Sequence, residues 1–551
     1  MLYNCTMPDN FDPTRIEDLT LRQVVIFLMN TVEKLTLQNQ TLQAENQTLR
    51  DEINRLKGEQ GKPKIQPSKK QGDVSSEKER HVPTSHKKSS HRQHMVISRT
   101  QTLTLDKSSL PADAVSKGYV AVMVQEAVFE AEVICFKREK YYAASTKQTY
   151  LAALPVGYDD GHFGPKLRAW VISLYFDSHM SEPKIHQFLT GLGLFISLGQ
   201  ISNILIYQQE PFATESAEVF EAGLASSPWQ NVDDTSTRVN GVNHVCQIVC
   251  NLLYTFYCTV AHKDRQNVVQ VLGGNPTLAY RYGPAAAAYL DSHKLPHKWQ
   301  ALLQALPTDR SLSEVEVTSW LRANVPELSE GHQRLVLEAM ALSHYHTQTQ
   351  VAQVQLLVCD DAPQWTGIAP EIGLCWVHAA RHYKKLRPVL AWHRTQLDSF
   401  ITAMWEYYRE LNAWRAAPCA AEAMRLRRCF EELFTTKTGY AALDERIAKT
   451  RANQTQLLAV LAHPEIPLHN NAAELGARQR VRKRDVSFGP RSPAGAAAWD
   501  NFMTLAATCR KLSVNFYTYI HDRLSQTYAL PSLASLITER AATLNLGASW
   551  V

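Results

Sequence analysis

The sequence predicts an α/β protein in which a long coiled-coil helix precedes a folded body built around a β-sheet. Three observations predict this fold: a leucine at every seventh position near the N-terminus, strand-like segments around residue 240, and long helical stretches between the strands. At 551 residues, of which 45% are hydrophobic, the chain is long enough to bury more than one core. We therefore expect several structural units in series.

Composition excludes several classes of protein. The sequence has no apolar run of about 18 residues and no N-terminal signal-peptide pattern, so we expect a soluble, cytoplasmic protein. Ten cysteines occur without a Cys-x-x-Cys pair, which argues against a disulfide framework and against a ribbon-type zinc site. The net charge of +5 is concentrated between Lys57 and Arg99, where 11 basic residues accompany 4 acidic ones. Such a local basic segment favours a polyanionic partner.

A leucine zipper is predicted within residues 1–58. Leu21 is the first of six leucines spaced by seven residues, and valine, asparagine and isoleucine fill the alternate seam position. This heptad pattern is typical of a parallel, in-register homodimer, in which paired seam asparagines fix the register. The residues predicted to dimerise the chain are Leu28, Leu35, Asn39, Leu42, Asn46, Leu49 and Leu56. The alternative is an amphipathic helix that packs on its own domain.

Two further units are predicted between the zipper and the main body. Residues 59–110 are rich in Lys, Ser, Pro and Gly, which predicts a disordered basic linker with non-specific affinity for phosphates. Residues 111–160 contain the alternating segment GYVAVMVQEAVFEAEVICFKREKYYA, which predicts a small antiparallel, β-rich unit.

Residues 161–225 are predicted to be helical and to contain a helix-turn-helix-like, DNA-binding unit. In MSEPKIHQFLTGLGLFISLGQISNIL, Ser181 can cap a first helix, two glycines supply the turn, and Ser197 with Gln200 forms a capping box. Candidate DNA-binding residues on the second helix are Gln200, Ser202 and Asn203. Two packed helices without a DNA role fit the same pattern, and both interpretations stay open at this point.

The region 226–525 is predicted to be the catalytic domain because it holds unusually placed acidic residues. VDDTSTRVNG has the pattern of a strand that enters an Asn-Gly hairpin turn, although Asp is disfavoured in strands. Two further strands and several helices follow before VQLLVCDDAPQW, a short apolar strand that ends in Asp360 and Asp361. This order resembles the ribonuclease-H-like core, in which an acid on the first strand lies beside an acid on the fourth.

A third acid is expected from a later helix that faces the sheet. The segment HNNAAELGARQRVRKRD places Glu474 on a helix that Asn470 or Asn471 caps. Three carboxylates supply hard oxygen ligands for two divalent ions, which activate a nucleophile and stabilise the leaving oxygen at a phosphodiester. Each acid alone also has a structural explanation: a helix cap, an Asx turn or an exposed strand position.

Helical insertions are expected near residues 276–350 and 376–460, because the acids lie farther apart in the sequence than the core elements require. Residues 526–551 are expected to form a C-terminal tail.

Three segments of the chain resemble the DDE transposases of bacterial insertion sequences, specifically the insertion-sequence-66 type. They are DDTSTRVNG, DDAPQW with LCWVHAARHYKKLRP, and IPLHNNAAELGARQRVRKRDVSFGPRS. The resemblance covers most of the chain from about Gly118 to Arg523, and members of that family also carry an N-terminal zipper. It implies that Asp233, Asp360 and Glu474 are the catalytic, metal-binding residues, that two magnesium or manganese ions are the cofactors, and that double-stranded DNA is the substrate.

The resemblance has further implications. Members of that family cut DNA at the ends of the element and join the freed 3′ hydroxyl to target DNA, which implies a nucleoid-associated bacterial protein with accessory transposition proteins as partners. Many relatives carry a cysteine-rich segment after the zipper. This chain lacks that segment, so no zinc site is expected.

Basic residues near the predicted site are expected to contact DNA phosphates. They lie on a helix after the second acid and on the helix of the third acid. The candidates are Arg381, Lys384, Lys385, Arg478, Arg480, Arg482, Lys483 and Arg484. Solvated helix faces are the alternative explanation for both basic runs.

Three other functions fit parts of the sequence. HAARH has the histidine spacing of zinc proteases, but Ala379 replaces the glutamate that serves as their general base. His378-x-x-Arg381 followed by Tyr407 and Tyr408 resembles a tyrosine recombinase, in which a tyrosine attacks the phosphate. A zipper-dimerised DNA-binding regulator, with purely structural acids, is the non-enzymatic alternative.

Overall fold

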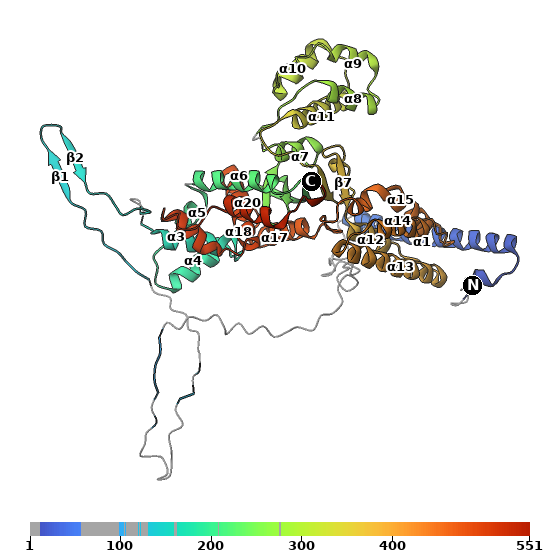
Figure 1. Ribbon diagram of the computed structural model, residues 1–551, viewed down its shortest axis with the longest axis horizontal. Helices are drawn as coiled ribbons and strands as arrows, with labels where there is room; N and C mark the ends of the chain where they lie inside the picture. The colour runs from blue at the N-terminus through green and yellow to red at the C-terminus, as the bar shows by residue number, and fades with distance from the viewer. Residues whose placement is uncertain are drawn as a thin grey trace, which may run out of the picture.

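The computed structural model describes most of the chain, and its elements are arranged around one sheet (Figure 1). The described residues are 11–56, 99–103, 105, 119–120, 122, 131–158, 162–207, 209–274 and 277–550. Most of the predicted basic linker and the first part of the predicted β-rich unit lie outside these ranges.

A five-stranded mixed sheet is the centre of the protein. Its strands are β3 (Trp229–Val239), β4 (Val242–Cys250), β5 (Thr255–Val260), β6 (Leu356–Cys359) and β7 (Glu371–Leu374), in the order β5-β4-β3-β6-β7. β3, β4 and β5 pair antiparallel, whereas β6 runs parallel to β3 and β7 runs parallel to β6. The predicted adjacency of the first and fourth strands is therefore present.

The turn between β3 and β4 fixes the register of the two strands. Asn240 and Gly241 form it, with φ angles of 49° and 80°, as a two-residue hairpin turn requires. In the resulting register, Asp233 lies opposite Ile248 and Asp234 lies opposite Gln247. Because successive strand residues point to opposite faces, the two adjacent aspartates face opposite sides of the sheet.

Helices cover both faces of the sheet. On one face, α6 (Glu210–Ala225) stacks Phe220 on Phe256 of β5, with ring centroids 4.1 Å apart. On the other face, the hydroxyl of Tyr257 donates to the carbonyl of Gly476 in α17 (Asn471–Ser487) at 3.1 Å. Phe256 and Tyr257 are neighbours on β5, so α6 and α17 lie on opposite sides of the sheet.

The free edge of β5 is covered by α18 (Pro493–Lys511). Three polar side chains one helical turn apart accept the edge amides: Thr508 from Thr255 at 3.3 Å, Thr504 from Tyr257 at 3.1 Å and Asp500 from Thr259 at 2.7 Å. An uncovered edge strand would offer these amides to another chain. The spacing of four residues on the helix therefore matches alternate residues of the strand and closes the sheet on this side.

Two helical lobes interrupt the chain around the strands of the sheet and extend away from the sheet (Figure 1). The first follows α7 (Arg265–Leu272) and consists of α8 (Pro284–Ser292), α9 (His297–Leu303), α10 (Glu314–Asn324) and α11 (Glu330–Thr347). The second follows β7 and consists of α12 (Trp376–Lys384), α13 (Ala391–Ala416), α14 (Ala420–Phe434), α15 (Ala441–Ala452) and α16 (Gln454–Leu457). Trp376, Tyr407 and Phe430 belong to a separate hydrophobic core in the second lobe. Both lobes lie within the segments where helical insertions are predicted.

The predicted helix-turn-helix region contains α6 and, before it, three short helices: α3 (Pro165–Phe176), α4 (Glu182–Gly191) and α5 (Leu198–Ile206). The capping box at the start of α5 is present: the amide of Gln200 donates to Ser197 at 3.2 Å, and the Gln200 side chain accepts from the Ser197 amide at 3.0 Å. Ser181 occupies the N-cap position of α4, but its side chain makes no capping hydrogen bond.

The C-terminal segment is part of the core, so its description as a tail is wrong. After α19 (Phe516–Leu524), α20 (Leu533–Leu544) buries Leu533 and Ile537 completely. The indole of Trp229, at the start of β3, donates to the carbonyl of Leu546 at 2.6 Å. The apolar residues of α20 are spaced to cover one helix face, which packs beside α6.

α1 (Leu19–Leu56) is a single helix of 38 residues that follows the short helix η1 (Pro13–Arg15). All six heptad leucines are exposed, by between 52% for Leu28 and 77% for Leu56. The opposite face of its first half packs on the second lobe, where Met29 and Glu33 are buried. The heptad seam of the isolated chain is therefore uncovered, and the helix is attached to the lobe by a different face.

Glu33 makes the polar part of this attachment. Its carboxylate accepts the amides of Val389 at 2.5 Å and Leu390 at 3.0 Å, at the start of α13, and lies 3.3 Å from Nδ1 of His393. An acidic side chain at a helix N-terminus satisfies free amides and interacts favourably with the helix dipole.

Among the described residues, no helix combines the length and the apolar character that crossing a membrane requires.

We predict that Glu33→Ala loosens the attachment of α1 to the second lobe. The substitution leaves buried amides and His393 without their partner, at a cost of about 1–3 kcal/mol. Hydrogen–deuterium exchange should rise in the first half of α1, whereas Glu45→Ala, at an exposed position of the same helix, should leave exchange unchanged. Unchanged protection in Glu33→Ala would contradict this account of the attachment.

Candidate functional site

Asp233 lies in the middle of β3, on the face of the sheet that α17 covers. It pairs in register with Ile248, and a Cβ on Gly476 of α17 would lie only 3.0 Å from the Ile248 side chain. Its Oδ1 accepts the amide of Asp234 at 2.8 Å. Asp234 faces the other side, where it pairs with Lys263 at 2.8 Å and accepts from Gln364 at 3.0 Å. The pleat of the strand thus directs Asp233, and not Asp234, towards α17.

Asp360 follows the last residue of β6 directly. Its Oδ1 accepts the indole N–H of Trp365 at 2.7 Å and the amide of Ala362 at 3.3 Å. The Asx-type turn that is the structural alternative for this residue is therefore present, and the indole bond orients the same carboxylate. Asp361 is exposed and lies 3.6 Å from His382.

Asn470 attaches the start of α17 to β3. Its amide nitrogen donates to the carbonyl of Val232 at 2.7 Å, and its amide oxygen accepts from Asn231 at 2.8 Å. It occupies the N-cap position as predicted, but its side chain bonds to the strand and makes no capping bond. Glu474 lies one turn farther along α17, so this attachment places it beside Asp233.

Gly476 allows α17 to approach the sheet closely. Any larger residue would bring a Cβ within 3.0 Å of Ile248 and 3.4 Å of Thr255. Contacts at such distances force the neighbouring groups apart. The missing side chain therefore keeps the first turn of α17, and with it Glu474, against β3 and β4.

Two of the predicted acids, Asp360 and Glu474, lie close enough to the third, Asp233, to act on it electrostatically. Burial, with smaller contributions from the negative charges of Asp234, Asp360 and Glu474, raises the pKa of Asp233 to about 7. A carboxyl group whose pKa is raised by burial and by neighbouring carboxylates is characteristic of sites that bind cations or transfer protons. The acids come from β3, from the end of β6 and from α17.

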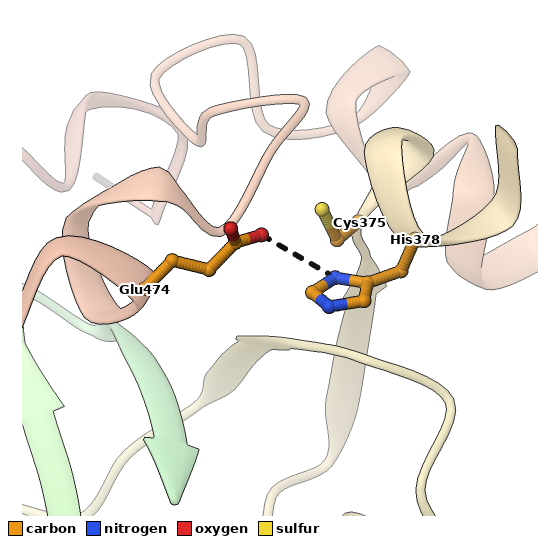
Figure 2. Close-up of side chains that lie close together, drawn as sticks. All are labelled: Cys375, His378 and Glu474. Carbon is orange, nitrogen blue, oxygen red and sulfur yellow. Dashed lines mark ion pairs between the residues drawn. The ribbon is translucent and has the colours of Figure 1, made fainter. Parts of the chain in front are cut away.

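Glu474 is also held by α12. Its Oε2 accepts from Arg381 at 2.9 Å, and its Oε1 lies 3.7 Å from Nδ1 of His378 (Figure 2). Burial and the positive charge of Arg381 lower the pKa of His378. Because Arg381 also donates to Nε2 of His378 at 2.8 Å, the neutral ring carries its proton on Nδ1, which faces Glu474.

The residues present fit a divalent cation. Glu474 Oε1 is buried and has no hydrogen-bond partner among the described residues. Arg381 pairs with Oε2 of the same carboxylate, so Oε1 is the oxygen that remains available to a cation. Magnesium and manganese prefer such carboxylate oxygens, and Asp233, Asp360 and Glu474 would be their ligands.

Cys375, His378 and Glu474 form a second grouping, whose ligand atoms lie within 4.8 Å of one another (Figure 2). This mixed set does not match the three carboxylates predicted for the site. Burial raises the pKa of the Cys375 thiol to about 11, and its Sγ accepts the amide of Asn470 at 3.2 Å. We therefore assign Cys375 to the attachment of α17.

A comparison with protein families matches residues 343–498 to the model described as Transposase IS66 family. This match contains Asp360 and Glu474. An uncharacterized protein from Sinorhizobium fredii, y4jO, is 31% identical over 325 residues, which cover 59% of this chain and 100% of the relative. The chain belongs to the IS66 transposase family. The predicted resemblance is thereby confirmed at the level of the family.

Two of the basic residues proposed to contact DNA in this IS66 family member are buried, so the prediction is wrong for Arg480 and Lys483. Arg480 forms a 3.0 Å ion pair with Asp500 and stacks over Trp499. Lys483 lies 3.0 Å from the ring centroid of Tyr175. Their spacing on α17 continues the buried face that begins at Ala473 and Gly476. In the sequence, the run of basic residues makes this face look exposed.

The other basic candidates keep varied positions. Arg478 and Arg482 are exposed on α17, and the half-buried Arg484 donates to the carbonyl of Ser236. On α12, Lys385 is exposed, Lys384 is half-buried and Arg381 is bound to Glu474. In the helix-turn-helix-like unit, Asn203 is exposed and Ser202 half-buried, while the Gln200 side chain is used by the capping box.

The alternative of a tyrosine recombinase does not fit the structure. Tyr407 and Tyr408 are 4% and 5% exposed in the core of the second lobe. The hydroxyl of Tyr407 donates to the carbonyl of Leu426 at 2.9 Å. A nucleophilic tyrosine has to reach a phosphate, and these two side chains are enclosed by α13 and α14.

Sequence reasoning missed two residues that shape the site. Trp365 orients Asp360, and the only signal for it is a tryptophan five residues after the aspartate. The sequence pattern indicates a helix cap at Asn470. In the structure its buried side chain bonds to β3, a contact with a segment that is distant in the sequence. Neither role follows from local periodicity.

We predict that Asp233→Asn stabilises the metal-free protein at pH 8 and leaves its stability unchanged near pH 4. The folded pKa of about 7 lies above the unfolded value of 3.8, so ionising Asp233 opposes folding increasingly between these values and constantly above them. The gain at pH 8 should be about 1–3 kcal/mol, after allowance for the solvent that reaches this half-buried group. Thermal melts in EDTA measure it.

The matched control is Asp361→Asn, which changes an exposed aspartate next to the site. Its stability difference from the parent protein should not grow with pH in the same way. Equal pH profiles for the two variants would argue against the electrostatic coupling of Asp233.

Proposed function

We propose that this protein is a DNA transposase that cleaves the ends of an insertion sequence and joins them to target DNA. Membership of the IS66 family suggests a nucleic-acid-processing enzyme with transposase activity. The observation that supports the specific proposal is that Asp360 and Glu474 lie close enough to the half-buried Asp233 to raise its pKa. Three acids from distant segments that act on one another in this way suit a metal-dependent reaction at a phosphodiester.

The sheet supports a ribonuclease-H-like catalytic core. Three antiparallel strands are followed, across a helix and a helical lobe, by a strand parallel to the first. This connection puts the end of β6 next to β3, and ligands of α/β sheets bind at the carboxyl ends of such parallel strands. Asp360 is at that end.

Asp233, Asp360 and Glu474 would hold two magnesium or manganese ions. When bound, such ions activate the attacking oxygen and stabilise the departing one. In the cleavage step, a water oxygen bonds to phosphorus, the bond from phosphorus to the 3′ oxygen breaks, and the water proton passes to solvent. In the joining step, the freed 3′ hydroxyl attacks a target phosphate in the same way, without a covalent bond to the protein.

The protein's own groups orient these acids. Trp365 and the amide of Ala362 fix Asp360, and Arg381 fixes Glu474. These bonds reduce the reorganisation that binding and reaction require. Exposed Arg478, Arg482 and Lys385 are proposed to neutralise DNA phosphates near the site, with Arg484 and Lys384 at its margin.

We predict that Asp233→Asn, Asp360→Asn and Glu474→Gln each reduce strand cleavage at least about 100-fold, because each removes one charged ligand of the two proposed metal ions. The assay incubates the full chain with labelled element-end DNA and magnesium, and a chelator should abolish cleavage. Asp361→Asn is the matched control and should cleave normally. DNA binding without cleavage in the parent protein, with any accessory proteins supplied, would favour a regulator over a transposase.

The α1 helix is proposed to pair two copies in parallel. Its heptad leucines are exposed on one face, while the opposite face is attached to the second lobe. Pairing would bury the leucine seam and leave this attachment intact. A dimer of this kind can hold two DNA ends.

We predict that Leu35→Glu with Leu42→Glu converts the dimer to a monomer in light-scattering measurements. Two charges in the seam oppose each other across the pair and remove its apolar contacts. Gln40→Glu adds a charge at an exposed position away from the seam and serves as the control, which should stay dimeric. A double variant that stays dimeric would exclude the seam as the interface.

A further inference from the structure

A two-stranded ribbon projects from the body of the protein (Figure 1). It consists of β1 (Lys140–Ala143) and β2 (Gln148–Leu151), paired antiparallel. We call residues 137–151 the tyrosine ribbon. It belongs to the segment in which a small β-rich unit is predicted.

The base of the tyrosine ribbon is fixed. Arg138 donates to the carbonyl of Ala152 at 2.6 Å, and the Ala152 amide donates to Glu139 at 2.9 Å, which extends the ladder below the strands. Phe136 packs edge-on against Tyr158, with ring centroids 5.1 Å apart. Gly157 then touches the end of α19, so the ribbon is attached to the body at its base and its tip is left outside.

The tip exposes large aromatic side chains. Tyr141, Tyr142 and Tyr150 are 67%, 66% and 52% exposed, and Leu151 is 48% exposed. A short hairpin has no core of its own and gains little from such residues in water. Grouped exposed aromatics mark an interaction surface.

Both faces of the ribbon carry these side chains. Tyr141 and Tyr150 are cross-strand partners and share one face. Lys140, Tyr142 and Leu151 lie on the other face, because side chains alternate along each strand. A partner that contacts both faces has to surround the ribbon.

The ribbon is also basic. Residues 137–151 contain Lys137, Arg138, Lys140 and Lys147 but only one acidic residue, Glu139. The three lysines are exposed, and Lys147 lies in the turn at the tip. Lysine is depleted from protein–protein interfaces, whereas lysines beside aromatics are typical of nucleic-acid contacts.

We propose that the tyrosine ribbon is a DNA-contacting arm that enters a groove of duplex DNA. The major groove accepts a two-stranded ribbon and its walls contact both faces of it, which a flat partner cannot do. The lysines then meet phosphates, and the tyrosines pack against sugars and base edges. This inference rests on the proposed function, because it assigns a second contact to the DNA that the acids would cut.

Fluorescence anisotropy of the full chain with a labelled duplex, in EDTA and at several salt concentrations, tests the arm without involving cleavage. In Lys137→Gln/Lys140→Gln/Lys147→Gln, the negative slope of log affinity against log salt should become shallower by about 2 to 3, at about 0.9 for each lost phosphate contact. In Tyr141→Thr/Tyr142→Thr/Tyr150→Thr, affinity should fall about 10-fold or more with little change in slope. Threonine keeps a high strand propensity, so the hairpin is retained.

Matched controls change the same residue types elsewhere on the surface. Lys34→Gln/Lys298→Gln/Lys437→Gln removes three exposed lysines from other elements, and Tyr528→Thr removes a tyrosine that is 65% exposed. Both should bind as the parent protein does. The ribbon variants should keep the melting temperature and the molecular mass of the parent.

Parent-like affinity and slope in both ribbon variants would overturn the inference, as would a changed oligomeric state, which would assign the ribbon to a protein contact. Tighter binding of a single strand that depends on the tyrosines would overturn the duplex assignment. Asp233→Asn separates the two proposals: it should bind like the parent and fail only in cleavage. Ribbon variants that bind normally while Asp233→Asn loses cleavage would refute the arm alone.

Discussion

The attachment of α17 to β3 is the constraint on which the rest of the site depends. Glu474 and Asp233 are far apart in the sequence, and they meet because Asn470 bonds to Asn231 and to the Val232 carbonyl. A buried amide that lost these bonds would cost about 1–3 kcal/mol, so this junction favours one geometry. Gly476 has no side chain that would push α17 away from the sheet.

This junction brings like charges together, which opposes folding. Burial and, to a lesser extent, the neighbouring charges raise the pKa of Asp233, so its ionised form is disfavoured in the folded protein. Arg381 and Trp365 offset part of this cost through bonds to Glu474 and Asp360. Unfavourable groupings of this kind are common at functional sites, and the proposed metal ions would offset the repulsion.

The same physical logic explains why charge in the sequence is an uncertain guide to surface function. Arg480 lies among the basic residues that follow Glu474, yet it pairs with Asp500, whose own oxygen atoms cover the edge of β5 at Thr259. Its charge belongs to the network that closes the sheet. At the tyrosine ribbon, by contrast, lysines are exposed on a hairpin beside aromatic side chains, which suits the proposed contact with DNA.

Local patterns in the sequence determined the long N-terminal helix, the Asn240–Gly241 hairpin and the capping box of α5, because each depends on neighbours a few residues away. The sequence also indicated the positions of both helical lobes and the candidate acids. Only the tertiary structure decided that Asp233 faces α17 while Asp234 faces Lys263, that Asn470 bonds a strand, that Arg480 and Lys483 are interior, and that the final helix belongs to the core. The physical reason is that the direction and burial of a side chain depend on which distant segment packs against it. The helix and strand periodicity of the local sequence carries no information about that segment.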